Sequence, residues 1–172
     1  MSERVLVISA SGPVCSVALF ESGQLRAAAE REAGHRASQA LIELSQEVLA
    51  KSNLNLADIE VFVADRGPGS FIGVRVGVTL VKSWGFALNR RVGSLSSFDL
   101  VPPQSTIQSR KGFYFIREGD TTQILPGDVP CEAPNAHRAP LGAIRECSLE
   151  ALAPDYVLEP SISTPKVPYA QA

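Results

Sequence analysis

A glycine-rich stretch, RGPGSFIGVRVG at residues 66–77, carries the residue types best suited to chemistry in this chain. It follows one apolar run and precedes another, which is the strand–loop–helix order of many anion sites. Glycine lets a backbone approach a phosphate closely, and the N–H groups at a helix start attract negative charge. The residues that would contact an anion are Gly67, Pro68, Gly69, Ser70 and Phe71. No lysine follows the glycines as in a P-loop, so a structural turn and a contact surface are the alternatives.

Nucleophilic and metal chemistry lack their usual residue patterns in this chain. Ser70 follows a glycine, but the next glycine lies three positions further on, so the GxSxG pattern of serine hydrolases is absent. The two histidines, His35 and His137, are far apart in sequence, and the three cysteines form no CxxC pair. We therefore predict no catalytic residue, no metal site and no cofactor.

The composition is that of a soluble globular protein. The chain has 172 residues, of which 45% are apolar and 20% charged, with a net charge of −2 and a pI of about 5.7. This balance argues against a strongly basic nucleic-acid-binding surface. The N-terminal apolar run is too short for a signal peptide, and no apolar stretch approaches the ~20 residues of a membrane-spanning helix. Since the cysteines also look like reduced thiols, we expect a cytoplasmic protein without membrane contact.

Apolar patterning divides the chain into two predicted lobes. The first holds strands at 5–8, 15–20, 25–30, 59–64 and 92–95, a helix at 37–51 capped by Ser38, and a short helix or turn at 96–99. Two prolines then end this unit, so the predicted lobes are residues 1–103 and 104–172. In the second lobe we expect a hairpin at 112–116 and 121–125, a helix at 141–152 and an extended proline-rich tail.

The segment 72–88 fits two secondary structures. Ile72, Val74 and Val76 alternate as they would in a strand, and β-branched residues favour that structure. The length of the run favours a helix, as does the spacing of Val74, Val78 and Val81. The pattern alone leaves both structures open.

Two apolar surfaces are candidates for partner binding. The apolar stripe of helix 37–51 is wider than a usual core-facing band, so the helix either lies in a groove of its own domain or is shared with a partner. If 72–88 is helical, two glycines four residues apart allow another helix to approach closely. The predicted partner-binding residues are Leu41, Leu44, Val48, Gly73, Val74, Gly77 and Val81.

The stretch GPGSFIGVRVG resembles the GPGSFTGLRVG signature of the TsaB (YeaZ) family. The residues at 92–99 resemble the family's VxxLxSFE segment, those at 109–114 its DARRGEVY segment, and those at 154–158 its PxYLR close. The resemblance implies an α/β fold of the actin-like ATPase type, built on an RNase H-like βββαβαβ core. The second lobe would be trimmed, because the region between Gly119 and Pro154 is short. The fold also makes 72–88 a helix.

The resemblance implies a non-catalytic role in making threonylcarbamoyladenosine on tRNA. Members of this family form a heterodimer with a TsaD-like transferase, mainly through the two N-terminal helices, and a TsaE-like ATPase joins them. Such a subunit meets tRNA only through the complex. A homodimer is an alternative, because helices built to meet a related partner can also meet a copy of themselves.

Three positions depart from the family pattern. The first strand ends in Ser9-Ala10-Ser11 where the family has Asp-Thr-Ser, so independent ATP hydrolysis is not expected. Ile72 replaces a threonine that could cap the helix, and Ser70 is its expected substitute. Asp65 puts a carboxylate beside the loop and would weaken an anion site there. A small actin-fold kinase or ATPase and a glycoprotease-like peptidase are the alternative functions.

Overall fold

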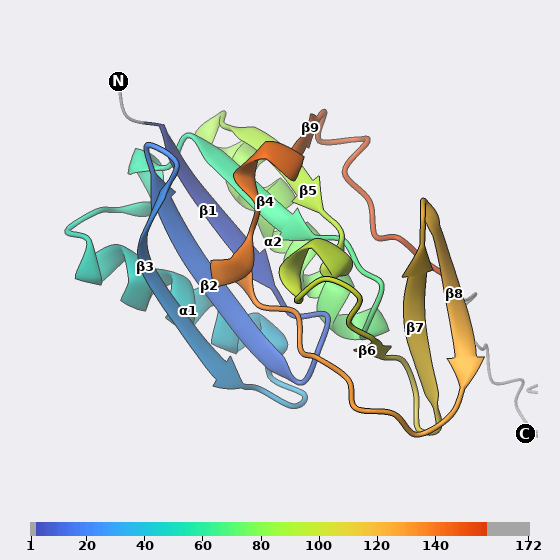
Figure 1. The fold of residues 1–172 in the computed structure, drawn as a ribbon. Helices are drawn as coiled ribbons and strands as arrows, with labels where there is room; N and C mark the ends of the chain where they lie inside the picture. The colour runs from blue at the N-terminus through green and yellow to red at the C-terminus, as the bar shows by residue number, and fades with distance from the viewer. Residues whose placement is uncertain (1–2, 158–172) are drawn as a thin grey trace, which may run out of the picture.

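The computed structural model describes residues 3–157 and contains two β-sheets (Figure 1). The larger sheet has six strands in the order β3-β2-β1-β4-β5-β9. These strands are β1 Arg4–Ser9, β2 Val14–Glu21, β3 Gln24–Glu32, β4 Val61–Asp65, β5 Arg91–Leu95 and β9 Arg145–Cys147. The first three strands form the predicted antiparallel meander, while β1, β4 and β5 run parallel. The predicted proline-rich tail lies outside the described residues.

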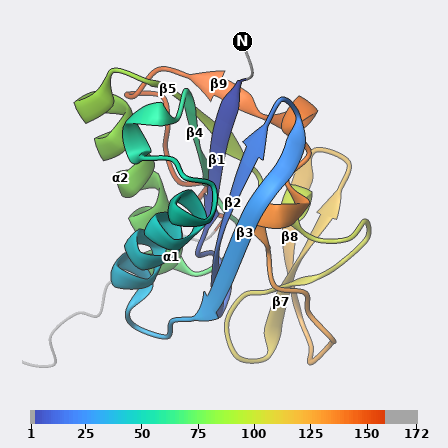
Figure 2. The same cartoon turned by 90° about the vertical axis from the view of Figure 1, so that its left-hand side faces the viewer.

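Two long helices, α1 Ala37–Lys51 and α2 Phe71–Leu88, cover one face of this sheet (Figure 2). The prediction of a helix at 37–51 is confirmed, and the ambiguous segment 72–88 is helical. Helical geometry turns Val74, Val78 and Val81 together onto the sheet, where they are buried. The prediction that Ser38 caps α1 is wrong, because the helix begins after Arg36 without a side-chain cap.

The opposite face of the sheet is covered by short 3-10 helices. These are η2 Ser97–Leu100, η3 Ala136–Arg138 and η4 Leu141–Ala143. Leu100 and Ala136 are buried there against apolar side chains of β1, β2 and β4. The predicted helix at 141–152 is wrong, because its first half forms η4 and then β9, which pairs with β5. Gly93 of β5 permits this packing, since a Cβ atom there would lie 2.8 Å from Ile144.

The smaller sheet contains β6 Ile107–Gln108, β7 Phe113–Glu118 and β8 Thr121–Pro126. Its last two strands form the predicted hairpin. Ile107 and Phe115 pack with Phe98 and Val101 in a separate apolar cluster. The elements η3 and β9 follow residue 103 in the chain but pack against the larger sheet. Part of the predicted second lobe therefore belongs with the first. The trimmed second lobe amounts to this small sheet and the turns beside it.

Helix α2 is longer and more apolar than expected from the sequence, where no stretch was expected to approach the length of a membrane-spanning helix. It has 18 residues with a mean hydropathy of 1.4, so among the described helices it is long and apolar enough to cross a membrane. Length and composition alone do not distinguish such a helix from the core helix of a globular domain. In this chain α2 packs along the six-stranded sheet and contributes to its main apolar core.

Candidate functional site

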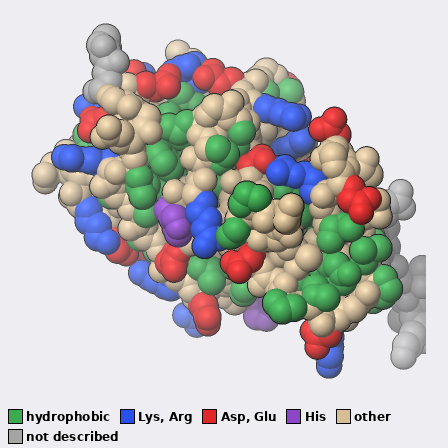
Figure 3. Space-filling model, viewed as in Figure 1, with side chains coloured by type: hydrophobic (Ala, Val, Ile, Leu, Met, Phe, Trp, Pro, Cys, Tyr) green, Lys and Arg blue, Asp and Glu red, His purple; other side chains and the backbone are tan. Residues whose placement is uncertain are grey.

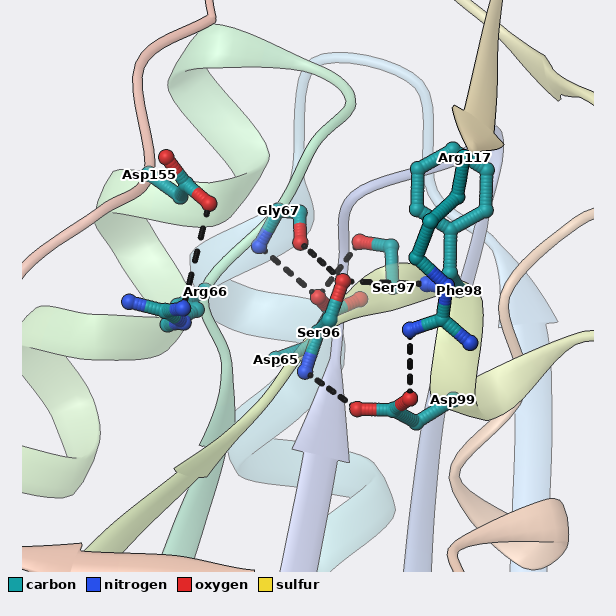
Figure 4. Close-up of polar contacts among 9 residues, drawn as sticks. All are labelled: Asp65, Arg66, Gly67, Ser96, Ser97, Phe98, Asp99, Arg117 and Asp155. Atoms are coloured by element: carbon teal, nitrogen blue, oxygen red, sulfur yellow. Dashed lines mark hydrogen bonds and ion pairs between the residues drawn. The ribbon is translucent and has the colours of Figure 1, made fainter. Parts of the chain in front are cut away.

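A buried carboxylate lies where the carboxyl ends of β1, β4 and β5 meet. Asp65, the last residue of β4, is only 1% exposed. It accepts hydrogen bonds from Ser9 Oγ at 2.6 Å, Ser97 Oγ at 2.5 Å, the Gly67 N–H at 2.9 Å, and Ser11 Oγ. We call these four side chains, Asp65, Ser9, Ser11 and Ser97, the Asp65 hub (part of it in Figure 4). The hub ties three neighbouring strand ends to one another and to the start of the glycine loop.

The environment of Asp65 acts on its protonation in two opposing ways. Burial raises the pKa of Asp65, while the hydrogen bonds from Ser11, Ser9, Ser97 and Gly67 oppose that rise. Asp65 lies beside the loop as predicted and takes up the Gly67 N–H, and its effect on an anion site there stays a prediction. The sequence did carry a signal for the hub, because Ser9 and Asp65 each end an apolar strand, and β1 and β4 are parallel neighbours.

The glycine loop uses several of its backbone hydrogen-bond donors internally. The Arg66 N–H donates to the Leu95 carbonyl (3.0 Å), and the Ser70 N–H donates to the Ser11 carbonyl (2.6 Å). Ser70 Oγ accepts from the Gly73 N–H at 3.2 Å, so Ser70 caps α2 as predicted. These donors are therefore not available to a phosphate. The arrangement favours a structural turn over an anion cradle.

Glycine is required in the loop by close packing against the β1–β2 turn. A Cβ atom at Gly69 would lie 2.2 Å from the Ser11 carbonyl oxygen, and one at Gly73 would lie 1.8 Å from the Ala10 carbonyl oxygen. Gly67 has a φ of 104°, which L-residues with side chains rarely adopt. Pro68 follows it through a cis peptide bond and is buried. The glycines that suggested a phosphate site thus accommodate the chain's own backbone.

Most of the predicted partner-binding residues belong to the chain's own core. Leu41, Leu44, Val48, Val74 and Val81 are each at most 4% exposed and lie in the cluster between the helices and the sheet. Their predicted contact with a partner therefore needs correction, because a buried side chain offers no surface. Gly73 is also committed internally, as its contact with Ala10 shows. Gly77 is buried as well, but it has room for a small side chain, since a Cβ atom there would meet nothing within 4 Å.

Other apolar residues of α1 and α2 do reach the surface. Ile72 is 67% exposed and Ile42 is 41% exposed. Val76, Leu80 and Trp84 are partly exposed and continue from Ile72 along α2 at intervals of four residues. We call these five residues the outer helix face. A hollow of about 390 Å³ lies beside Ile42 and Trp84. The extra width of the apolar stripe on helix 37–51 was the sequence signal for this surface.

Phe71, at the end of the loop, is 37% exposed and lies against two other side chains. Its ring lies 5.1 Å from that of Tyr156, and the Arg75 guanidinium lies 5.2 Å above it. Within residues 3–157, no three His, Cys, Asp or Glu side chains are placed to hold a metal ion. The three cysteines are free thiols, and Cys15 is buried. This part of the chain offers packing surfaces and a hydrogen-bonded polar hub.

A mixed sheet in the order β3-β2-β1-β4-β5, with the first three strands antiparallel and two helices on one face, is an RNase H-like core. The chain is thus an α/β protein of the actin-like ATPase fold with a reduced second lobe. A family model described as TsaD, tRNA N6-adenosine threonylcarbamoyltransferase, matches residues 30–127. Together with the relatives below, this match shows that the chain belongs to the TsaB (YeaZ) family within that wider group.

Several curated relatives carry the name tRNA threonylcarbamoyladenosine biosynthesis protein TsaB. The protein from Escherichia coli K12 is 36% identical over 79 residues, which cover 46% of this chain and 34% of the relative. The protein from Haemophilus influenzae is 31% identical over 93 residues, covering 54% of this chain and 39% of the relative. The chain therefore spans between about a third and a half of the curated relatives it matches.

Solved structures show the same fold over most of the chain. YeaZ from Pseudomonas aeruginosa superposes with a TM-score of 0.75 and 18% identity, covering 90% of this chain and all of the other. An uncharacterised protein with similarity to peptidase YeaZ, also from Pseudomonas aeruginosa, gives a TM-score of 0.77 at 18% identity, with 91% and 100% covered. At this level of identity the likeness establishes the fold alone.

Proposed function

We propose that this chain is a non-catalytic subunit in the biosynthesis of tRNA threonylcarbamoyladenosine. It binds a TsaD-like transferase through the outer helix face, and the complex, joined by a TsaE-like ATPase, acts on tRNA in the cytoplasm. The names of the relatives support the pathway. The observation that carries the binding role is the apolar stripe that α1 and α2 leave partly exposed, beginning at Ile72.

The internal hydrogen bonds of the glycine loop support a non-catalytic role. An actin-fold kinase or ATPase would need loop N–H groups free to bind phosphate, and those of Arg66, Ser70 and Gly73 already have acceptors. The peptidase alternative would need a nucleophile or a metal with its partners. Ser70 is instead engaged as the cap of α2.

The proposed surface has the composition of a helix-packing site. Residues spaced four apart on α2 form a continuous ridge, and Gly77 lies beside it with no neighbour within 4 Å of its Cβ position. A ridge next to a gap of this kind can interlock with a helix of a partner. The same surface could pair two copies of this chain, so a homodimer is one outcome of the test below.

Binding to the TsaD-like protein of the same organism tests the proposal. We expect Ile72→Glu and Ile42→Glu each to weaken the affinity measured by calorimetry by about tenfold or more, because a carboxylate would be buried without a partner. Gly77→Leu should weaken it similarly, while the free chain stays folded. The matched control is Leu25→Glu, since Leu25 is 49% exposed and pairs with Phe20, whose side chain packs on the sheet face away from the helices.

The results have distinct meanings. No complex between two folded proteins at micromolar concentrations would refute the proposal. If Leu25→Glu weakens binding as much as Ile72→Glu, the outer helix face is not the binding surface. Light scattering of the chain alone measures whether it forms a homodimer. If it does, dissociation of the homodimer by Ile72→Glu would indicate that the homodimer and the complex with the transferase use the same face.

A further inference from the structure

An apolar groove lies beside the outer helix face, where the β1–β2 turn, the segment between β3 and α1, and the start of α2 meet. Its volume is about 550 Å³, which is the size of a binding pocket. Helix α2 contributes Ile72 and Val76 to the groove, and the other apolar residues that line it are Ala10, Pro13, Cys15, Ala33 and Ala37. A groove of this composition is a surface on which apolar side chains of another segment can be buried.

The last described residues of the chain lie at the edge of this groove. The Tyr156 ring is 5.1 Å from that of Phe71, and Val157 packs against the apolar cluster that contains Ile107. The positions next to Phe71 and Ile107 in the sequence, which are 70, 72, 108 and 109, all line the groove. The chain therefore passes position 157 between two segments that border the groove, and residues 158–172 follow from there.

The next six residues, LEPSIS at 158–163, have the pattern of a half-buried extended segment. We call them the LEPSIS segment. Apolar and polar side chains alternate along it, with Leu158, Pro160 and Ile162 at one set of positions and Glu159, Ser161 and Ser163 at the other. An extended backbone turns alternate side chains to opposite sides, so the three apolar ones would share one side. The proline also has no backbone N–H that burial in an apolar groove would leave without an acceptor.

We propose that the LEPSIS segment binds in this groove of its own chain, with Leu158, Pro160 and Ile162 against the apolar walls and the polar side chains toward solvent. The alternative site is the apolar surface over the β7–β8 hairpin (Figure 3), because Val157 also packs with Phe115 of β7. The groove is favoured because its walls come from several elements, so that it buries more of each apolar side chain than one sheet surface does.

The bound segment covers part of the outer helix face, and this consequence rests on the proposed function. Ile72 and Val76 line the groove and also belong to that face, so the segment competes with the transferase for them. Ile162→Ser should therefore strengthen binding of the transferase, measured by calorimetry, by about threefold or more. An unchanged affinity would refute the competition.

NMR spectroscopy of the full chain, labelled at its isoleucine and valine methyl groups, tests the docking of the segment. We expect nuclear Overhauser contacts between the methyl groups of Ile162 and those of Ile72 or Val76. Ile162→Ser should shift the methyl resonances of Ile72 and Val76, because it removes the apolar side chain beside them. The matched control is Val167→Ser, which removes an apolar side chain beyond the LEPSIS segment and should leave those resonances in place.

Four results would overturn the proposal. The first is absence of contacts between Ile162 and the groove in the folded chain. The second is contact of Ile162 with Ile124, which would place the segment on the hairpin. The third is an equal effect of Val167→Ser and Ile162→Ser. The fourth is contact that arises only between a labelled and an unlabelled copy in a mixed sample, which would show that the segment binds a second chain. Because the chain is measured alone, these outcomes are independent of its binding to a transferase.

Discussion

Gly73 and Gly77 of α2 should respond in opposite ways to the same substitution. Both are helical glycines four residues apart, so intrinsic helix propensity favours alanine at each by about 1 kcal/mol. Their surroundings differ. A Cβ atom at Gly73 would lie 1.8 Å from the Ala10 carbonyl oxygen, whereas one at Gly77 would meet nothing within 4 Å.

The cost at Gly73 follows from the movement that the methyl group demands. Ordinary contact between carbon and oxygen needs about 3.2 Å, so the start of α2 would have to move by about 1.4 Å. That movement breaks the bond from the Ser70 N–H to the Ser11 carbonyl, worth about 1 kcal/mol, and adds the 1–3 kcal/mol typical of overpacking. After the propensity gain of about 1 kcal/mol, Gly73→Ala should destabilise the chain by about 1–3 kcal/mol. Gly77→Ala should stabilise it by about 0.5–1 kcal/mol.

Urea unfolding followed by circular dichroism and by the fluorescence of Trp84 would measure both changes. Trp84 is the only tryptophan of the chain, and its ring lies 5.6 Å from that of Phe62 in the core, so its emission reports on packing of α2. In a thermal melt of a chain of this size, Gly73→Ala should lower the melting temperature by about 2–12 °C and Gly77→Ala should raise it by about 1–4 °C. A neutral Gly73→Ala, or a Gly77→Ala that destabilises as strongly, would refute the packing described for the loop.

Two further predictions concern the polar groups around the loop. Asp65→Ala should cost about 2–4 kcal/mol, because three buried hydroxyls lose their acceptor, whereas Asp65→Asn should cost less than about 1 kcal/mol. Burial raises the pKa of Asp65 in the folded chain, so the folded state holds the proton of the Asp65 carboxyl group more tightly than the unfolded state does. The stability of the unchanged chain relative to Asp65→Asn should therefore fall as the pH rises above the ordinary carboxyl value of about 3.9. Urea unfolding between pH 4 and 8 measures this difference, and a constant difference would contradict it. Ser70→Ala should cost about 1 kcal/mol by loss of the cap on the Gly73 N–H, and an unchanged urea midpoint would show that the cap is dispensable.

The sequence predicts the elements of this fold better than it predicts contacts between distant segments. Helix 37–51 has the predicted bounds, because its apolar spacing is set by local geometry. The segment 72–88 remained open until the family resemblance was used, since its valines satisfy both a strand and a helix. The helix expected at 141–152 fails because β9 gains its hydrogen bonds from β5, a partner about 50 residues away.

The candidate site shows the same division between local and distant information. The capping role of Ser70 could be predicted, because the capping hydroxyl and the Gly73 N–H that donates to it are three residues apart. The Asp65 hub needed the register of β1 against β4, which brings Ser9 and Asp65 together across 56 positions. The exposure of Ile72 also depends on which side of α2 faces the sheet. The periodicity of apolar residues indicates that a helix has an apolar stripe. It does not indicate which side of that stripe is covered by the sheet or by the neighbouring helix.

The two ends of the glycine-rich stretch therefore have different roles. From Gly67 to Gly73 the chain packs onto the β1–β2 turn, and substitution there should change the stability of the free protein. At Gly77 itself α2 has room for a small side chain, and substitution there should change what the helix binds without destabilising the free protein. Because Ile72 lies at the boundary, fixed by the cap at Ser70 yet 67% exposed, the inner packing of the loop orients the outer helix face. A variant that loosens the loop, such as Gly73→Ala, should then weaken partner binding even when most of the chain is folded, whereas Ile72→Glu should weaken binding without a change in stability.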